Sequence, residues 1–394
     1  MGAIFLNELG IICSMGADKD QVTSNLFSAT LPETLTVSEQ YSRGRPSHVG
    51  SVNSALPDLS HLEKQWRSRN NQLISAAVEQ IKPAVESLIK RHGTHRIAVV
   101  LGTSTSGVGE SEKAHEHKLE NSEWPEAFHY MQQETGAPAL FLSHILGITG
   151  PSHVVSTACS SSAKAMASGA RLLNAGLADA VIVGGADSLC AFTLAGFASL
   201  ESLSTDPCNP FSANRKGINI GEGAALFVMS REPGPVKLLG WGESSDAHHM
   251  SAPEPSGAGA GSALAQTLHR ANLEAGQIDY INLHGTATPQ NDAMEARIVH
   301  AFFGDRVPAS STKAMTGHAL GAAGAIEAGL CWLCLVRNPD GLLPAHWFDG
   351  ELDESLPKIQ LVVPGQKSSR ILQNIVSQSF AFGGSNAAIC LGRA

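Results

Sequence analysis

The sequence predicts an α/β protein whose two halves share one rhythm of strands and helices. Its strand-like segments are continuously apolar instead of alternating, which is typical of sheets covered on both faces by helices. Such segments alternate with helical patterns in both halves, and the 39 glycines provide many tight turns. With 394 residues the chain has room for two domains of ordinary size. We therefore expect duplicated α/β layers, although no sequence repeat is visible.

In the first half, short apolar runs predict buried strands at residues 3–13, 96–101, 153–157 and 179–183. Helical patterns are found at residues 18–27, 71–91 and 163–174. Pro83 is expected to kink the second of these helices, because proline lacks the N–H that a helix interior needs. The charged segment 110–134 predicts an exposed helical excursion.

A Pro- and Gly-rich stretch at residues 230–235 is the best candidate for a boundary between the halves. It divides the chain into an N-terminal half, 1–233, and a C-terminal half, 234–394. The second half should contain a helix at residues 262–275 and an Ala-rich helix at residues 325–336. Its strands are expected from residue 236 onward and at residues 280–283, 359–363, 371–379 and 387–391.

Composition argues against several classes of protein. The formal net charge of −9 disfavours a nucleic-acid-binding protein, and no apolar run approaches the length of a membrane span. The amino terminus lacks the pattern of a secretory signal, and the seven scattered cysteines are typical of reduced thiols, so we expect a cytoplasmic protein. Cys331 and Cys334 have metal-ligand spacing but lie in an apolar helical run without a second ligand pair. They predict core packing and no metal site.

Cys159 lies where the strand at residues 153–157 gives way to the helix at residues 163–174. Ser160, Ser161 and Ser162 offer cap side chains between them. Unsatisfied N–H groups at the positive end of a helix would favour a thiolate and could hold an oxyanion. The alternative is a small thiol packed in a core, which is the commoner fate of a free cysteine. This stretch alone leaves both interpretations open.

Two histidines of the second half are candidates for work beside Cys159. His284 follows the strand at residues 280–283 and precedes a glycine and two threonines, whereas His318 precedes small residues that allow close helix packing. A Gly-rich turn near Phe382 would present backbone N–H groups. Each histidine alone could be structural. Together with a cysteine at a helix start they form a constellation typical of nucleophilic catalysis.

The stretches VSTACSSSAKA, LHGTATP, STKAMTGHALGAAG and SQSFAFGGSNA occur in the order and spacing seen in β-ketoacyl-[acyl-carrier-protein] synthases. More narrowly, the chain resembles the elongating type II enzymes with a Cys-His-His triad. Residues 215–224 and 244–250 extend the resemblance over nearly the whole chain. It implies a thiolase-like fold, in which duplicated βαβ halves form a five-layered αβαβα sandwich, and an acyltransferase activity.

The resemblance implies a decarboxylative Claisen condensation that gives a 3-oxoacyl-carrier protein. Cys159 would take the acyl group from an acyl carrier protein, and the backbone N–H groups of Cys159 and Phe382 would form the oxyanion hole. Malonyl-carrier protein would then lose carbon dioxide, and the neutral imidazoles of His284 and His318 would stabilise the enolate. Lys313 and Glu327 resemble the supporting ion pair of the family, although a purely structural pair is compatible with this role.

The resemblance also assigns substrate contacts. Thr286 and Thr288 match the residues that bind the phosphopantetheine arm, which belongs to the carrier protein, so no cofactor is expected. Phe380 and Phe382 match the gate between the arm channel and the acyl pocket, and Phe197 would form a pocket wall. Thr105 falls near the acyl pocket, where a polar residue would favour an unsaturated or otherwise unusual acyl chain.

Lys64, Arg67 and Arg69 fall where the family places a basic patch for its acidic carrier protein, against the alternative of a solvated helix face.

Three classes of assembly remain open. The chain could act as a homodimer, or as the catalytic half of a heterodimer with an inactive chain-length-factor paralogue. A non-catalytic scaffold subunit is disfavoured by the retained triad. Fatty-acid, polyene and polyketide elongation all fit the motifs.

Overall fold

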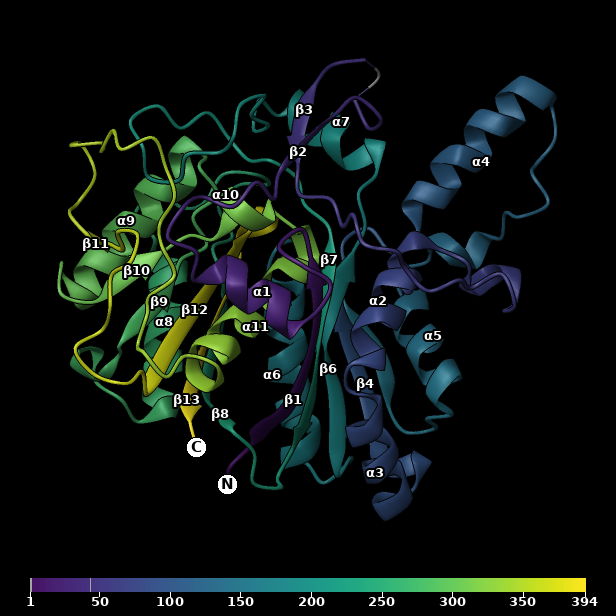
Figure 1. Ribbon diagram of the computed structural model, residues 1–394, viewed down its shortest axis with the longest axis horizontal. Coiled ribbons are helices and arrows are strands. Elements are labelled where there is room, and N and C mark those ends of the chain that lie inside the picture. Colours follow the sequence, from purple (N-terminus) through teal and green to yellow (C-terminus); the bar gives the residue numbers. More distant parts are fainter. Residues whose placement is uncertain (1, 43) are drawn as a thin grey trace.

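The computed structural model describes residues 2–42 and 44–394, and its main sheet repeats one strand order twice (Figure 1). Within these residues the sheet has 11 strands in the order β11-β10-β9-β12-β13-β8-β1-β7-β6-β4-β5. A separate two-stranded sheet pairs β2 (Thr36–Ser38) with β3 (Ser47–Val49). The two halves of the main sheet meet where β1 pairs with the start of β8.

The duplication is visible in the pairing of the strands. The first half uses β1 (Phe5–Cys13), β4 (Ile97–Gly102), β5 (Ser152–Val155), β6 (Ala180–Asp187) and β7 (Gly223–Ser230). The second uses β8 (Val236–Ser245), β9 (Tyr280–Asn282), β10 (Pro308–Ser310), β12 (Asn374–Ala381) and β13 (Ser385–Arg393), with β11 (Gln360–Leu361) at the edge. If the strands of each half are counted along the chain, both halves have the order 3-2-4-5-1 with the same parallel and antiparallel pairs. The division after residue 233 itself stays a prediction.

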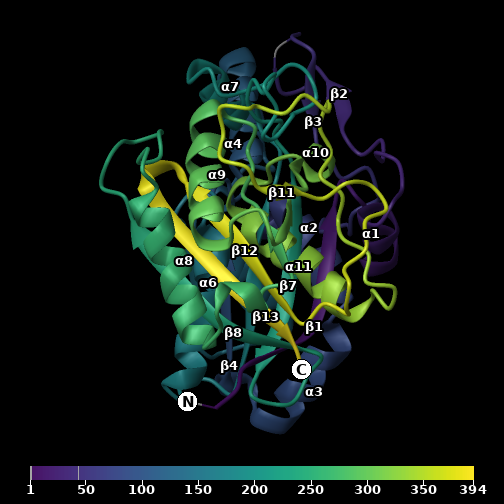
Figure 2. The same cartoon turned by 90° about the vertical axis from the view of Figure 1, so that its left-hand side faces the viewer.

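Helices form three layers around the two halves of the sheet, which follow one another from left to right in Figure 1, whereas Figure 2 looks onto one of the outer layers. The middle layer contains α6 (Ser161–Asn174), which packs on β4 and β6, and α11 (Ala323–Val336), which packs on strands of both halves. The outer layers contain α2 (Arg69–Glu79) and α5 (Ala137–Leu146) on one side, and α8 (Ala258–Ala271) and α9 (Pro289–Phe303) on the other. The apolar strands are covered on both faces, as the sequence predicted.

The helical region at residues 71–91 differs from the prediction. It forms two helices, α2 and α3 (Lys82–His92), and Pro83 lies in the first turn of α3. The first N–H groups of a helix have no intrahelical partner, so proline costs little there and starts a helix instead of kinking one.

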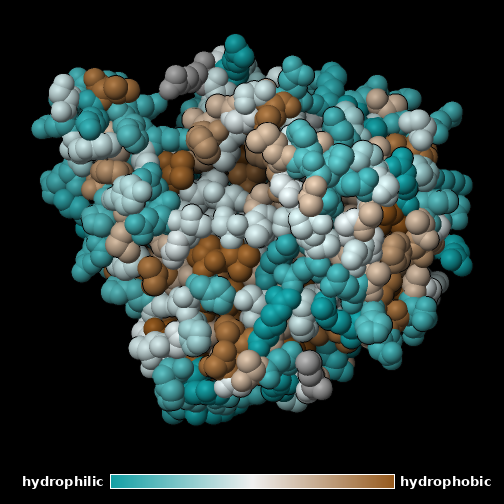
Figure 3. Space-filling model, turned by 180° about the vertical axis from the view of Figure 1, so that it is seen from behind, coloured by the Kyte–Doolittle hydropathy of each residue, from teal (hydrophilic) through white to brown (hydrophobic). Residues whose placement is uncertain are grey.

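The charged segment after β4 forms α4 (Val108–Asn121), which stands away from the body of the protein (Figure 1). The view from behind shows that hydrophilic residues cover most of this excursion (Figure 3). The predicted exposed helix is therefore confirmed. The remaining helices are α1 (Lys19–Leu26), α7 (Ala191–Ser199) and the short α10 (Lys313–Thr316).

The strand before Cys159 is less buried than predicted. β5 is the last strand of the sheet, so one of its edges pairs with no other strand of the described chain, and His153 is exposed. Cys331 and Cys334 are fully buried in α11 and pack in the core, as predicted. Within the described residues, no helix is long and apolar enough to cross a membrane.

Gly10 lies where β1 approaches the backbone of α2 closely. A Cβ atom at Gly10 would lie 2.0 Å from the carbonyl oxygen of Ala77, so the backbone of α2 would have to move. We expect Gly10→Ala to lower the free energy of unfolding by about 1–3 kcal/mol. Thermal unfolding of the purified variant measures this loss. Gly136→Ala is the matched control, since a Cβ there meets nothing within 4 Å; equal melting temperatures for the two variants would contradict the prediction.

Candidate active site

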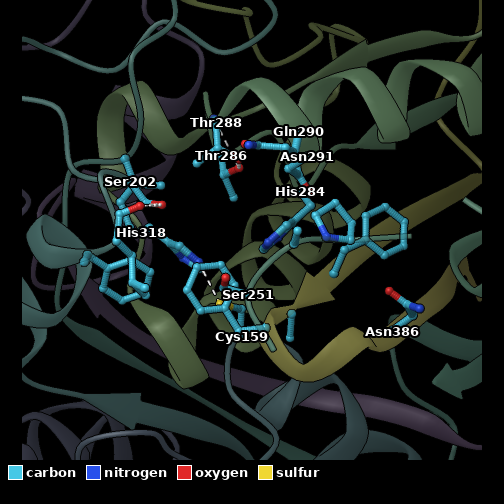
Figure 4. A pocket seen from close by; sticks show the side chains of 18 residues that line it. Cys159, Ser202, Ser251, His284, Thr286, Thr288, Gln290, Asn291, His318 and Asn386 are labelled. Carbon is cyan, nitrogen blue, oxygen red and sulfur yellow. Dashed lines mark hydrogen bonds between the residues drawn. The ribbon is translucent and has the colours of Figure 1, made fainter. Parts of the chain in front are cut away.

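Loops from both halves of the fold meet around a cavity of about 110 Å³ (Figure 4). Cys159 reaches it from the end of β5, and His284 from the end of β9. His318 follows α10, and Phe382 follows β12. The thiol sulfur and one ring nitrogen from each histidine all lie within 4.8 Å of one another. The structure therefore brings together the three side chains that the motifs singled out.

The turn that carries Cys159 is held by its own hydroxyl groups. Ala158 has a left-handed backbone, with φ of 51°, and Cys159 lies two residues before the start of α6. The Oγ atom of Ser161 accepts a hydrogen bond from Thr157 N at 2.9 Å and donates one to Ala158 O at 2.5 Å. Ser160 is the residue before the helix, but its side chain caps no helical N–H, so that part of the cap prediction is wrong.

Burial decides the resting state of the nucleophile. Cys159 is only 5% exposed, and the loss of water raises the pKa of its thiol to about 12. The charge of Lys313 and the backbone N–H groups of Phe382 and Cys159 act in the opposite direction but do not outweigh burial. The N–H groups at the helix start therefore favour the thiolate, as predicted, but burial outweighs them in the resting protein. His318 Nε2 lies 3.0 Å from the sulfur, where it can take the thiol proton.

The two imidazoles are neutral at pH 7. His284 and His318 are buried with ring centroids 5.3 Å apart and ring planes at 82°. Burial first, and the charge of Lys313 second, lower the pKa of both rings well below the usual range of histidine. Uncharged rings can donate hydrogen bonds to a developing oxyanion without supplying a mobile proton.

Lys313 and Glu327 form a buried ion pair behind the histidines. Their side chains are 1% and 2% exposed, and Lys313 Nζ also donates a hydrogen bond to the carbonyl oxygen of His284 at 2.5 Å. Burial raises the pKa of Glu327, and Lys313 opposes that shift. The predicted supporting pair is therefore present in the structure.

Two further acids position the site and were missed by the sequence analysis. Glu295, on α9, accepts hydrogen bonds from the backbone N–H groups of His284 at 2.6 Å and Gly285 at 2.7 Å. Asp187, at the end of β6, accepts hydrogen bonds from Ala322 N before α11 and from the loop after β4. The sequence could have indicated Glu295, because it is an acidic residue in the helix that directly follows the His284 loop. No local pattern marked Asp187.

Most of the predicted substrate contacts line this cavity. They are Thr286 and Thr288, whose hydroxyl oxygens are 3.0 Å apart, and Phe197, Phe380 and Phe382. The rings of Phe197 and Phe382 lie 5.3 Å apart. Thr105 does not line the cavity, because its hydroxyl donates a hydrogen bond to Asp187 at 2.8 Å. Its assignment to an acyl pocket stays a prediction.

The predicted basic patch is largely occupied by internal contacts. Arg69 binds both oxygens of the fully buried Glu222, at 2.8 and 2.5 Å, so it forms a structural ion pair. Arg67 Nε donates to Leu62 O at 2.8 Å, and Lys64 lies 3.5 Å from Glu126. The role of these three residues in carrier-protein docking stays a prediction.

Comparisons with known proteins agree with this site. Residues 58–233 match the family model of the β-ketoacyl synthase N-terminal domain, and residues 236–342 match that of the C-terminal domain. Nodulation protein E of Rhizobium meliloti is 31% identical over 98% of both chains. The 3-oxoacyl-[acyl-carrier-protein] synthase 2 of Rhizobium meliloti (strain 1021) is 39% identical over 62% of both chains.

A solved complex of the ketosynthase ApeO with its chain length factor ApeC, from Xenorhabdus doucetiae, contains a similar chain. It superposes with a TM-score of 0.94 at 44% sequence identity, with 100% of this chain and 98% of that chain covered. This chain therefore combines the strand order, the layered architecture and the grouped Cys159, His284 and His318 with sequence and structural matches over its whole length. The chain belongs to the β-ketoacyl synthase family and has its thiolase-like fold.

Proposed function

We propose that this chain joins an acyl group held on Cys159 to malonyl-acyl carrier protein, as the catalytic subunit of a heterodimer with a chain-length-factor paralogue. The observation that carries the chemistry is the thiol sulfur lying within 4.8 Å of two buried histidine nitrogens. The observation that favours the heterodimer is the match at 44% identity over the full chain to a member of a ketosynthase and chain-length-factor complex.

The first step is transfer of the acyl group. Cys159 Sγ attacks the thioester carbonyl of an acyl-carrier protein while His318 Nε2, 3.0 Å away, takes the thiol proton. The N–H groups of Cys159 and Phe382, which already act on the sulfur, receive the negative charge of the tetrahedral intermediate. Collapse of the intermediate leaves the acyl thioester on Cys159 and gives the proton to the departing pantetheine thiolate.

The second step makes the carbon–carbon bond. Malonyl-carrier protein would place its thioester oxygen between His284 and His318, and loss of carbon dioxide would leave an enolate there. Because burial and Lys313 keep both imidazoles neutral, they can stabilise this oxygen as N–H donors; His318 acts here in the tautomer that carries its proton on the nitrogen facing the cavity, the reverse of the tautomer that accepts the thiol proton in the first step. The enolate carbon attacks the acyl thioester, and the Cys159 thiolate leaves and takes up a proton from water.

The arm of the carrier protein would run along Thr286 and Thr288, whose hydroxyls face the cavity. The pantetheine arm arrives with the substrate, so the proposal requires no resident cofactor or metal. The seven cysteines are all free, which suits the reducing cytoplasm that we propose as its location.

The exposed edge of β5 supports assembly with a second chain of the same fold. Backbone groups on a free strand edge are a ready template for pairing with another strand. A partner strand added at β5 would lie beside Cys159, only four residues beyond the end of that strand. A partner that lacks the cysteine would leave this chain as the catalytic one, which suits a specialised polyketide or polyene pathway.

The assignment of Cys159 as the nucleophile can be tested by the mass of the acylated protein. We expect Cys159→Ala to abolish the acyl adduct that the intact protein forms with acyl-carrier protein, because no other cysteine lines the cavity within the described residues. Intact-protein mass spectrometry after incubation measures the adduct. Cys190→Ala is the control, since this thiol is also buried but lies outside the cavity. Undiminished loading of the Cys159 variant would refute the assignment.

The protonation state of the histidines predicts that the decarboxylation rate changes little as the pH falls. Both pKa values are lowered, so the rings stay neutral, and active as donors, while the pH falls through the usual pKa of histidine. We expect the decarboxylation rate of malonyl-carrier protein at saturation to change less than about twofold between about pH 8 and about pH 6. A loss of rate with a midpoint near pH 6.5 would show that a histidine titrates in its ordinary range.

The partner is tested by co-expression with a synthase paralogue from the same genome that lacks the cysteine, with an affinity tag on the paralogue only. We expect the two chains to co-purify in a 1:1 ratio by native mass spectrometry, and condensation activity to require both. A stable homodimer of this chain with full activity and no retention by the paralogue would contradict the heterodimer. It would leave the Cys159 chemistry intact.

A further inference from the structure

The turn that carries the second oxyanion donor, Phe382–Gly384, is intrinsically soft. Gly383 and Gly384 both have left-handed backbones, with φ of 79° and 71°, and a Cβ at Gly383 would meet nothing within 4 Å. Two consecutive glycines leave this turn with few restraints of its own, apart from the pairing of Ala381 with Ser385 at its base. Contacts at the ends of the turn must therefore hold the backbone N–H of Phe382 in front of Cys159.

One side of the turn is held by the segment after β8. Gly383 N donates a hydrogen bond to Met250 O at 2.8 Å, and Asp246 N donates one to Gly384 O at 2.9 Å. Asn386 Nδ2 donates to Asp246 Oδ1 at 2.6 Å, which ties the start of β13 to the same segment. These contacts restrain the turn toward the second half of the fold only.

The other side is held through the hydroxyl of Ser385, directly after the turn. Ser385 Oγ lies 2.6 Å from Lys164 Nζ and 2.9 Å from Ser160 Oγ, and both groups donate to it. Ser160 directly precedes α6 and Lys164 lies near its start, one and five residues after Cys159. These two hydrogen bonds join the helix of the nucleophile to the turn of the oxyanion donor, across the two halves of the protein.

Lys164 has no carboxylate partner that would otherwise explain its place. It is half-buried, and among residues 2–42 and 44–394 it takes part in no ion pair. The charged groups that face it are Glu243 on β8 and Arg171 on α6, and these two pair with each other. Burial lowers the pKa of Lys164, which is the sign of an ammonium group held against its hydration. The hydrogen bond to Ser385 is the contact that compensates the ammonium group for this loss of hydration.

We propose that Lys164 is a positioning residue that holds Ser385, and through it the N–H of Phe382, at the distance from Cys159 that the oxyanion requires. The inference rests on the proposed function, since the oxyanion forms during acyl transfer and condensation. The ammonium touches no reacting atom. Its effect appears in the rate of the chemical steps and leaves the binding of the carrier proteins unchanged.

Lys164→Met and Ser385→Ala test the proposal, because each removes one end of the same hydrogen bond and keeps most of the packing. A displacement of about 1 Å at a reacting centre can cost up to ~10²-fold in rate, so we expect each variant to lower kcat for condensation by about 10- to 100-fold. The KM values for both carrier proteins should stay within about twofold. The rate of acyl loading on Cys159 should fall with kcat.

The double variant identifies the shared path. If Lys164 acts through Ser385, the double variant should be no slower than the slower single variant. Lys90→Met, an exposed lysine on α3, is the matched control and should keep wild-type kcat. Melting temperatures of all variants separate a loss of folding from a loss of rate, and Ser385→Ala serves alone if Lys164→Met does not fold.

Two outcomes would overturn the inference: wild-type kcat in both single variants, or losses that multiply in the double variant. Either result with an active wild-type protein would reject only the role of Lys164. A wild-type protein that forms no acyl adduct on Cys159 would instead reject the proposed function.

Discussion

The site depends on one buried ion pair, Lys313 with Glu327, placed behind two histidines. An ammonium group 1% exposed to water is stable only where a carboxylate and a carbonyl oxygen replace its hydration, and Glu327 and His284 supply these. The pair links α10 to α11 and fixes the loop after β9. Burial first, and the positive charge of Lys313 second, also keep both imidazoles neutral. The same ion pair thus fixes the geometry of the site and contributes to its protonation state.

Burial has opposite consequences for the two kinds of catalytic group. It keeps the imidazoles uncharged, which an enolate requires, but it raises the pKa of the Cys159 thiol to about 12, which disfavours a free thiolate. A dry pocket therefore needs a proton acceptor in contact with the sulfur, and His318 Nε2 is 3.0 Å away. The same desolvation strengthens the hydrogen bonds that the N–H groups of Cys159 and Phe382 offer to developing charge.

The duplicated fold explains how these groups meet. The nucleophile comes from the first half and both histidines from the second, so the site exists only where the middle helices pack closely. Gly324 on α11 permits that approach, since a Cβ there would lie 3.1 Å from Ala163 on α6. Gly102 lets α6 lie close to β4, since a Cβ there would lie 2.3 Å from Ser162 N. The proposed Lys164 contact belongs to the same seam, since it joins α6 of one half to β13 of the other.

Local patterns in the sequence determined the fold class, the order of most strands and helices, the exposed α4 excursion and the chemistry-bearing residues Cys159, His284 and His318. These features depend on periodicity, turn residues and short motifs, which are properties of neighbours along the chain. The tertiary structure alone decided that Arg69 pairs with Glu222, that Thr105 binds Asp187, and that Glu295 holds the His284 loop. It also decided that burial outweighs the N–H groups that favour a Cys159 thiolate, because the loss of water around a group depends on neighbours that are distant in the sequence.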